Sequence, residues 1–371
     1  LSGVSVSIPG AGSTTTNAGG GYSVPVSPNS TYQVSVSGAG VSASASAVVG
    51  TDNVGLDFIK GEVTAVPPGC VERWWGSNRY ETAVAVSKAT YPSGAEVVYV
   101  ASGWNFPDAL AAGAAAAAEN APILLVHKNL IPPETETELQ RLGPSTVVIL
   151  GGTAAIDQSV ATQIGNLTGA TIDRRWGPTR YETAAEISER AFAQGANTVF
   201  VATGTDFPDA LAAAPGAVAA GSPLLLVPTT GIPPAVQVEL VRLNPKKIEV
   251  IGSPSAIPDW LLGALAGYAT QGADRTYGSD RYATSVEVSK MTFPNGANTV
   301  LIAVGAKFPD ALAGGPATGV FPGPILLVQE NAIPWVVSAE LDRLGPDRIV
   351  VLGGPAAVSS LVASQLAIYL D

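Results

Sequence analysis

The sequence predicts an α/β protein of three tandem Rossmann-like units with open parallel sheets, preceded by a small all-β sandwich. Three observations support this fold class. One five-residue motif occurs three times at constant spacing. Within each copy, continuous apolar runs alternate with segments that carry helix start and stop signals. The first part of the chain instead places apolar residues at every second position, between clusters of turn-forming residues.

The repeat is most visible in the motif Phe-Pro-Asp-Ala-Leu, which returns at an offset of 101 residues. An apolar strand follows each motif at the same offset. A repeat this regular makes most of the chain three copies of one unit, so any function of the unit is expected to be multivalent. We place the boundaries at 1–67 for the β-sandwich and its linker, and at 68–169, 170–270 and 271–371 for the three copies.

The N-terminal part predicts short antiparallel strands near Val4–Ile8, Tyr22–Val26 and Tyr32–Val36, separated by Gly, Ser and Asn. This pattern resembles the carboxypeptidase-regulatory-like, transthyretin-related β-sandwich, which is a spacer in surface proteins. Such domains have another strand before the first one seen here. We therefore hypothesise that Val4–Ile8 is an open edge that pairs with upstream sequence or with another chain. A truncated chain is the alternative, since the sequence opens within a motif.

The first copy illustrates the expected order of elements in each unit. Its strands are continuously apolar and alternate with helices, which is typical of a parallel sheet covered on both faces. The expected elements are a strand at Val71–Trp75, a helix from Arg79, a strand at Val97–Val100, a helix opened by Pro107, a strand at Pro122–Val126, a helix from Ile131–Pro133 to Leu142, a strand at Val147–Leu150 and a helix through Leu167.

In such sheets, ligands bind beyond the carboxyl ends of the strands. That edge collects one Gly and one Asp from each copy as structural or binding residues: Gly103, Gly204, Gly305, Asp108, Asp209 and Asp310. In the first copy it also collects His127 and Gly151-Gly152. The glycine pair could cradle a phosphate, but it is not a phosphate-loop motif, and the second copy has Gly252-Ser253 there.

Three arginines per copy recur at the same offset: Arg73, Arg174 and Arg275; Arg79, Arg180 and Arg281; and Arg141, Arg242 and Arg343. Those of the last set follow a Glu by three positions, and we expect a solvated helix pair worth only ~0.2–0.5 kcal/mol. Arg79 begins a helix, where its charge opposes the helix dipole. Either an ion pair with Asp108 or an anionic ligand would compensate that charge.

Composition and motif content exclude several classes of function. The net charge of −11 lacks the basic balance that nucleic-acid binding requires. The single cysteine, Cys70, allows no intrachain disulfide, and together with a single histidine it excludes a His/Cys zinc site. No apolar run has the length of a membrane-spanning helix. No nucleophile–base pair, paired-carboxylate constellation or dinucleotide motif repeats across the copies, so we expect no catalysis and no cofactor.

Taken together, the motifs resemble a known family. Arg-x-(Trp/Tyr)-Gly-x-x-Arg-Tyr-x-Thr, Phe-Pro-Asp-Ala-Leu and Pro-(Ile/Leu)-Leu-Leu occur in this order within about 100 residues, three times between residues 70 and 371. A Gly-Gly pair follows them in the first and third copies, and Gly252-Ser253 follows them in the second. This combination resembles the type 2 cell-wall-binding repeat. The resemblance implies three modules packed around a pseudo-threefold axis on the surface of a Gram-positive bacterium. It also implies non-covalent attachment to an anionic wall glycopolymer.

In that family, the Ile-Leu-Leu segment and a nearby arginine are implicated in attachment. Carried onto this sequence, the polymer-binding residues are Ile123, Leu124, Leu125 and Arg79; Leu224, Leu225, Leu226 and Arg180; and Ile325, Leu326, Leu327 and Arg281. The second copy departs from the pattern at Leu224, and the third carries Ala283 and Tyr277 where the others have Glu and Trp. These departures leave open whether all three sites bind equally.

The favoured interpretation is a secreted, non-catalytic module that anchors a protein to the cell wall. Its expected partner is an anionic cell-wall polysaccharide, and we expect neither nucleic-acid binding nor membrane insertion. The alternative is a self-assembling surface-layer or extracellular filament subunit, which would bind copies of itself through the N-terminal β edge. The residues argue against an enzyme, because no catalytic constellation recurs with the repeat.

Overall fold

The computed structural model describes residues 5–9, 11–15, 27, 30–38, 41–49, 57–59, 62–64, 71–104, 109–306 and 309–370. The expected strand at Tyr22–Val26, together with Cys70 and Asp108, lies outside these residues. From Val71 onward the described elements follow the predicted alternation of strands and helices.

Each copy contributes equivalent strands and helices in the described residues. The first copy contains β7 (Val71–Trp74), α1 (Arg79–Thr90), β8 (Val97–Ser102), α2 (Ala112–Ala118), β9 (Ile123–Val126), α3 (Pro133–Leu142), β10 (Thr146–Leu150) and α4 (Gln158–Thr168). The second contains β11 (Thr171–Arg175), α5 (Arg180–Ala191), β12 (Thr198–Thr203), α6 (Pro208–Ala219), β13 (Leu224–Val227), α7 (Pro234–Leu243), β14 (Lys247–Ile251) and α8 (Asp259–Ala266). The third contains β15 (Ala273–Thr276), α9 (Arg281–Thr292), β16 (Thr299–Val304), α10 (Pro309–Val320), β17 (Ile325–Val328), α11 (Trp335–Leu344), β18 (Arg348–Leu352) and α12 (Ser360–Leu366), followed by a short 3-10 turn at Ala367–Tyr369.

Each parallel sheet receives one edge strand from the next copy. The strand orders are β11-β10-β8-β9, β13-β12-β14-β15 and β17-β16-β18-β7. Thus β11 opens the second copy but pairs with β10 of the first, and β15 opens the third copy but pairs with β14 of the second. The sheets therefore run one strand out of phase with the sequence repeat.

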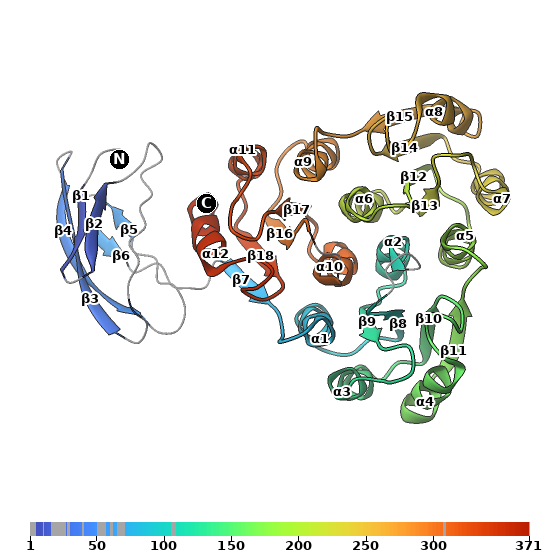
Figure 1. Cartoon of the computed structure of the whole chain (residues 1–371), viewed down its shortest axis with the longest axis horizontal. Coiled ribbons are helices and arrows are strands. Elements are labelled where there is room, and N and C mark those ends of the chain that lie inside the picture. Colours follow the sequence, from blue (N-terminus) through green and yellow to red (C-terminus); the bar gives the residue numbers. More distant parts are fainter. Residues whose placement is uncertain are drawn as a thin grey trace.

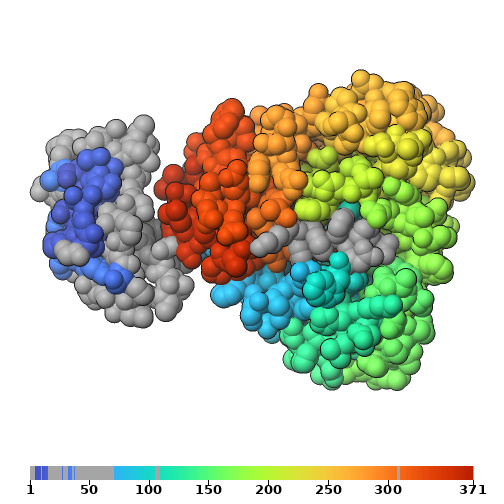
Figure 2. Space-filling model, viewed as in Figure 1, coloured from blue at the N-terminus to red at the C-terminus, as the bar shows by residue number. Residues whose placement is uncertain are grey.

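The first strand of the repeat region closes a ring with the last. β7 pairs in parallel with β18, with Val71 opposite Ile349 and Trp74 opposite Leu352. The ring is visible in Figure 1, where the three sheets surround α2, α6 and α10. In Figure 2 the red C-terminal segment lies against the light-blue start of the first copy. The expected pseudo-threefold arrangement is confirmed.

Small residues line the axis where α2, α6 and α10 meet. Gly113, Ala214 and Gly315 are equivalent positions, and a Cβ placed on Gly315 would lie 3.2 Å from the Cα of Gly113. One helical turn later, a Cβ on Gly319 would lie 3.1 Å from the Cβ of Ala117. The absence of larger side chains allows the three backbones to approach one another, and the buried core continues across all three copies.

Different ion pairs connect the copies at their meeting points. Arg348 of the third copy bonds Glu72 of the first at 2.7 Å, and its guanidinium lies 5.3 Å from the ring of Trp74. Arg175 of the second copy bonds Glu119 of the first at 2.9 Å. The second–third meeting point has Lys247 and Asp274 at the positions of Arg348 and Glu72, and they form an ion pair at 3.0 Å.

The recurring Glu–Arg pair is a buried network and not the solvated pair expected from the sequence. Glu239 is 3% exposed, accepts two bonds from Arg242 at 2.7 and 2.8 Å, and accepts a further bond from Ser188. Arg242 also donates to the carbonyl of Phe192 at 3.0 Å. The i, i+3 spacing was correct, but the pair ties α7 to the end of α5, and the other copies repeat it.

The N-terminal strands form antiparallel sheets. β1 (Ser5–Ile8), β2 (Gly12–Thr15), β3 (Ser30–Gly38) and β4 (Val41–Val49) pair in the order β2-β1-β3-β4, and β5 (Asp57–Ile59) pairs with β6 (Glu62–Thr64). Our hypothesis of an open edge at Val4–Ile8 is wrong for the described residues, because β1 is paired on both sides. The edges of this sheet are β2 and β4. The packing of the sheets into a sandwich stays a prediction.

Adding bulk at the axis is expected to destabilise the ring. The Gly315→Val variant should lower the free energy of unfolding by about 1–3 kcal/mol, because its side chain meets the backbone of Gly113. Gly263→Val on α8 is the matched control, since no atom lies within 4 Å of a Cβ there. Chemical denaturation measures both, and equal effects would contradict close packing at the axis.

Removing one partner of the buried network is expected to cost more than removing a surface pair. Arg242→Ala leaves the Glu239 carboxylate buried, and the free energy of unfolding should fall by about 3–5 kcal/mol. The control is Arg190→Ala, which breaks the exposed pair with Glu186 and should cost below about 1 kcal/mol. Urea titrations of the two variants compare them, and similar midpoints would refute a structural role for the network.

Candidate binding sites at the copy junctions

The motif Arg-x-(Trp/Tyr)-Gly-x-x-Arg-Tyr-x-Thr forms the turn from the exchanged strand into the next helix. In the third copy, the Gly278 N–H donates to the hydroxyl of Thr284 at 3.1 Å. Gly76 and Gly177 donate to Thr82 and Thr183 in the same way, at 3.3 and 3.1 Å. A side chain on any of these glycines would overlap the residue at the third position of the helix. The motif thereby fixes the start of α1, α5 and α9.

The arginine at each helix start is held over the carboxyl edge of its own sheet. Arg281 donates to the carbonyl of Gly305 at 2.6 Å, and Arg79 and Arg180 donate to the carbonyls of Gly103 and Gly204. These glycines are needed because a Cβ would meet the tyrosine that follows the arginine; on Gly305 it would lie 2.8 Å from Cε1 of Tyr282. Gly103, Gly204 and Gly305 therefore have a structural role at the strand ends.

The expected ion pair within one copy is absent in the second copy. Among the described residues, Arg180 forms no ion pair with Asp209. Asp209 instead faces the third copy, where the Thr284 hydroxyl and the charge of Arg281 both act to lower its pKa. The guanidinium of Arg281 also lies 5.7 Å from the ring of Phe207 in the second copy. The Asp of the second copy thus lies near the Arg of the third copy. The sequence analysis considered each copy by itself and did not predict this contact.

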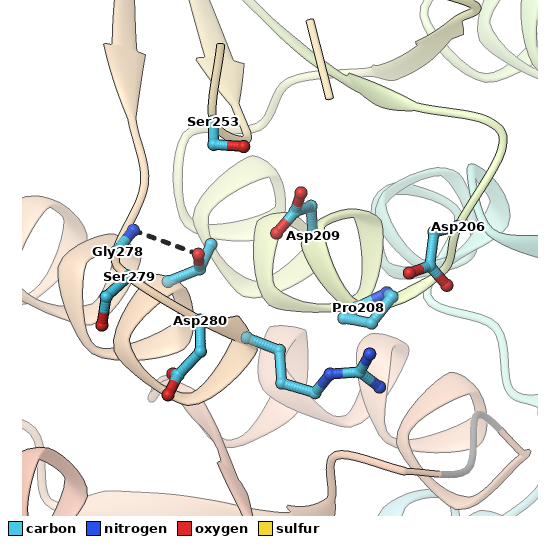
Figure 3. Close-up of a pocket in the computed structure, with 9 residues that line it drawn as sticks. Asp206, Pro208, Asp209, Ser253, Gly278, Ser279 and Asp280 are labelled. Atoms are coloured by element: carbon cyan, nitrogen blue, oxygen red, sulfur yellow. Dashed lines mark hydrogen bonds between the residues drawn. The ribbon is translucent and has the colours of Figure 1, made fainter. Parts of the chain in front are cut away.

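At the second–third boundary, the Phe-Pro-Asp loop of one copy meets the Arg-Tyr helix start of the next. We call this place, and the positions equivalent to it by the 101-residue repeat, the copy junctions. At the second–third junction lies a half-open cavity of about 190 Å³. Figure 3 shows that Asp206, Pro208 and Asp209 approach it from the second copy, and Ser279 and Asp280 from the third. Its lining consists of Asp206, Pro208, Asp209, Ser253, Gly278, Ser279, Asp280, Arg281 and Thr284.

Several lining residues were not among the candidates from the sequence, namely Asp206, Ser253, Ser279, Asp280 and Thr284. They come from loops that belong to different copies, so no single repeat unit displays them together. One signal in the sequence could have indicated these junctions. Because the repeat has a constant offset of 101 residues, the helix start of each following copy comes after the sheet of the copy before it. The equivalent residues of the third–first junction include Asp310, whose carboxylate lies beside Gly353. Asp108 of the first–second junction is outside the described residues.

The electrostatics of this cavity centre on Asp209. Burial raises the pKa of Asp209 to about 6, and the charge of nearby Asp206 acts in the same direction. Arg281 and the Thr284 hydroxyl act in the opposite direction. The cavity therefore contains the guanidinium of Arg281 together with several carboxylates. One of these carboxylates, that of Asp209, changes its charge close to neutral pH.

The Ile-Leu-Leu segments lie inside the sheets. Ile123, Leu124 and Leu125 form β9 and are at most 2% exposed. Leu224, Leu225, Leu226, Ile325, Leu326 and Leu327 are equally buried in β13 and β17. Their side chains are core residues, and a contact of these segments with a polymer stays a prediction. The strands they form lead directly to the carboxyl edge at which the junction arginines lie.

The first copy carries a polar aromatic cluster at the same edge. His127 Nδ1 lies 2.9 Å from the Tyr80 hydroxyl and 3.2 Å from the Trp104 indole nitrogen. Because the indole N–H can only donate, His127 Nδ1 accepts that bond and the other ring nitrogen carries the proton in the neutral form. The guanidinium of Arg79 lies 4.9 Å from the Trp104 ring. The other copies place Pro228 and Gln329 at the position of His127, so this cluster is not repeated.

Within the described residues, no group of three or more His, Cys, Asp and Glu side chains is arranged to hold a metal ion. In the same residues, no helix has both the length and the apolar character of a membrane span.

Neutralising Asp209 is expected to stabilise the protein above pH 6. The pKa of Asp209 is higher in the folded protein than in the unfolded chain, so its stabilising contribution is complete below pH 3.8 and is lost as pH rises through about 6. Asp209→Asn should therefore raise the free energy of unfolding at pH 7.5, by at most about 3 kcal/mol, with no gain near pH 4. Denaturant titrations across this range test it, with Asp342→Asn on the exposed face of α11 as control. A gain that is equal at both pH values would contradict the assignment.

Comparison with known proteins agrees with this architecture. The cell wall binding domain 2 (CWB2) family matches residues 73–161, 174–261 and 275–363, which together exceed two thirds of the chain. The three matches coincide with the three structural copies. Each begins at the arginine of an exchanged strand, Arg73, Arg174 or Arg275.

Among curated proteins, the chain is similar to the N-acetylmuramoyl-L-alanine amidase LytC of Bacillus subtilis (strain 168), with 30% identity over 82% of this chain and 59% of that protein. It is also similar to the amidase enhancer of the same organism, with 26% identity over 82% of this chain and 41% of that protein. The chain thus spans about half the length of these relatives.

Two solved structures share the fold. Cwp6 from Clostridium difficile superposes with a TM-score of 0.78 at 23% identity, covering 92% of this chain and 57% of that one. Cwp8 from the same organism gives 0.76 at 21% identity, covering 93% and 60%. The repeat matches, the ring of exchanged strands and these neighbours together show that the chain belongs to the cell wall binding domain 2 family.

Proposed function

We propose that this chain is a non-catalytic anchor that holds a protein to the wall of a Gram-positive bacterium by binding an anionic wall polysaccharide at its copy junctions. The observation that carries the proposal is the position of Arg79, Arg180 and Arg281. Each begins a helix at the carboxyl edge of a parallel sheet, the edge at which open α/β sheets bind ligands. Arg281 also lies at a junction formed by two copies, and the repeat places Arg79 and Arg180 at the equivalent positions.

The geometry of the arginine supports an anionic partner. Arg281 uses one guanidinium nitrogen for the Gly305 carbonyl, and that bond fixes the direction of the side chain. A guanidinium carries five donors in a fixed plane, so others remain to bind a carboxylate or phosphate group. Arg281 also lines the cavity of the second–third junction, which a ligand group can enter.

The ring converts three weak contacts into firm retention. Because β7 closes onto β18 and the core is continuous, the junctions are held at constant separation. A repetitive polymer that occupies one junction is present at high effective concentration at the next. The net charge of −11 opposes polyanion binding overall, so local arginines must supply the attraction.

The buried Ile-Leu-Leu strands fit this proposal as supports of the site. β9, β13 and β17 place their carboxyl ends beside the glycines that accept the arginine bonds, since Gly103 and Gly305 donate their N–H to Val126 and Val328 at 2.9 Å. A change in these strands would move the glycine carbonyl and, with it, the arginine. We propose that their contribution to attachment is this positioning.

Self-association remains the second candidate function. It now rests on β2 and β4, which are the edges of the N-terminal sheet in the described residues. Unpaired strand edges recruit strands of other chains. A chain that stays monomeric at high concentration would remove this candidate and leave wall binding unaffected.

Removing the junction charges is expected to weaken wall binding. The variant Arg79→Gln/Arg180→Gln/Arg281→Gln keeps a donor for each glycine carbonyl but loses three positive charges. Its co-sedimentation with purified Gram-positive cell walls at low salt should fall by about tenfold or more, since loss at three linked sites multiplies. Binding of the unchanged chain should also weaken as salt is added.

A matched variant controls for net charge. Lys88→Gln/Lys246→Gln/Lys290→Gln removes three exposed charges near the opposite edge of the sheets, at the ends of α1 and α9 and before β14. It should sediment with walls as the unchanged chain does. If the arginine variant, with an unaltered circular dichroism spectrum, also sediments fully, the junction arginines do not bind the wall.

A further inference from the structure

Three exposed aromatic side chains occupy the same position in the three copies. Trp75, Trp176 and Tyr277 lie at the offset of 101 residues, each directly after the exchanged strand of a sheet. They are 47%, 52% and 44% exposed. Because the strands β7, β11 and β15 are parallel to their neighbours, these side chains lie at the same carboxyl edge as the junction arginines.

Repetition separates these residues from other exposed aromatics. A single exposed tryptophan is ordinary on a protein surface. Trp335, which is 80% exposed, stands where the first and second copies carry Pro133 and Pro234. Trp104, which is 68% exposed, stands where the other copies carry Thr205 and Ala306. In contrast, all three copies retain an aromatic ring after the exchanged strand.

The rings of Trp75 and Trp176 pack against a glycine of the neighbouring copy. A Cβ on Gly354 would lie 2.8 Å from Cε3 of Trp75, and one on Gly152 would lie 3.1 Å from Cε3 of Trp176. The absence of these side chains lets the indole pack on the backbone while about half of it stays exposed. The strand beneath is fixed as well, because the Gly353 N–H donates to the Trp74 carbonyl at 3.0 Å. An aromatic surface fixed before binding loses little entropy on contact.

A polar cavity adjoins the position of Tyr277. Tyr277 follows β15 and Ser253 follows shortly after β14, with which β15 pairs. Gly278 and Ser253 line the cavity that contains Arg281 and Asp209. One face of a pyranose ring presents C–H groups, which leave water favourably against an aromatic face. The hydroxyls and charged substituents of the same sugar would face the polar lining.

We propose that Trp75, Trp176 and Tyr277 are stacking platforms for pyranose rings of the wall polysaccharide, one at each copy junction. This inference rests on the proposed wall-binding function. It adds an uncharged contact, aromatic stacking on sugar rings, to the attraction between the arginines and the anionic groups of the polymer. The second–third junction differs from the others, with Tyr277 in place of Trp and Ser253 in place of the glycine. This junction is the weakest of the three platforms, because its ring is smaller and its neighbour carries a side chain.

Salt distinguishes stacking from charge attraction. In about 1 M salt the screening length falls to ~3 Å, so contacts between arginine and anions fade while stacking persists. The test compares Trp75→Leu/Trp176→Leu/Tyr277→Leu, which keeps apolar packing on the glycines, with the Phe series at the same positions, which keeps an aromatic face. Both are sedimented with purified Gram-positive walls at low salt and at 1 M NaCl, with Trp335→Leu as control.

The Leu series should lose the salt-resistant binding by about tenfold or more, while the Phe series and Trp335→Leu retain most of it. Polysaccharide released from the same walls should compete with the unchanged chain. Full binding by the Leu series, or equal losses in the Leu and Phe series, overturns the stacking proposal and leaves the arginine proposal standing. Binding that is abolished by protease treatment of the walls points to a protein partner and also overturns it. Failure of the unchanged chain to bind any wall overturns both proposals.

Discussion

The exchange of one strand between consecutive copies is the constraint on which the rest of the structure depends. β11 and β15 are each paired along their backbone with the sheet of the preceding copy, and β7 completes the cycle against β18. Each copy therefore lacks a complete sheet by itself. Because the exchanged strand leads directly into the next helix, the same pairing sets the distance between an aromatic ring, an arginine and the acidic loop of the neighbouring copy. The junctions are consequences of how the ring closes.

The junctions are similar in plan but different in detail. Arg348 and Glu72 join the third copy to the first, and Arg175 and Glu119 join the first to the second. The cavity described for the second–third junction contains Asp209, whose pKa is raised to about 6 by burial. Differences of this kind give each junction its own charge, so three related sites need not have equal affinity.

Local signals in the sequence were sufficient to predict the order of strands and helices in each copy. Pro133 and the left-handed Gly143 mark the ends of α3, and the apolar runs mark the strands. The exchange of strands was not predictable from one unit, because Val71–Trp74 fits the edge of its own sheet and that of another copy equally well. Burial of Glu239 was missed since i, i+3 spacing is the same on exposed and buried helix faces.

β2, with the sequence Gly-Ser-Thr-Thr, has no apolar alternation, and its omission made β1 look like an edge. The contact of Asp209 with the third copy was also missed, because it depends on the exchange of strands between copies.

The central claim is that the binding sites are composite and lie between copies. A crystal structure of the chain soaked with an oligosaccharide released from Gram-positive walls tests this most directly. The account predicts sugar density at the copy junctions, in contact with Arg79, Arg180 or Arg281 and with residues of the preceding copy. Density confined to one copy, away from every junction, or bound only to the N-terminal strands would contradict it.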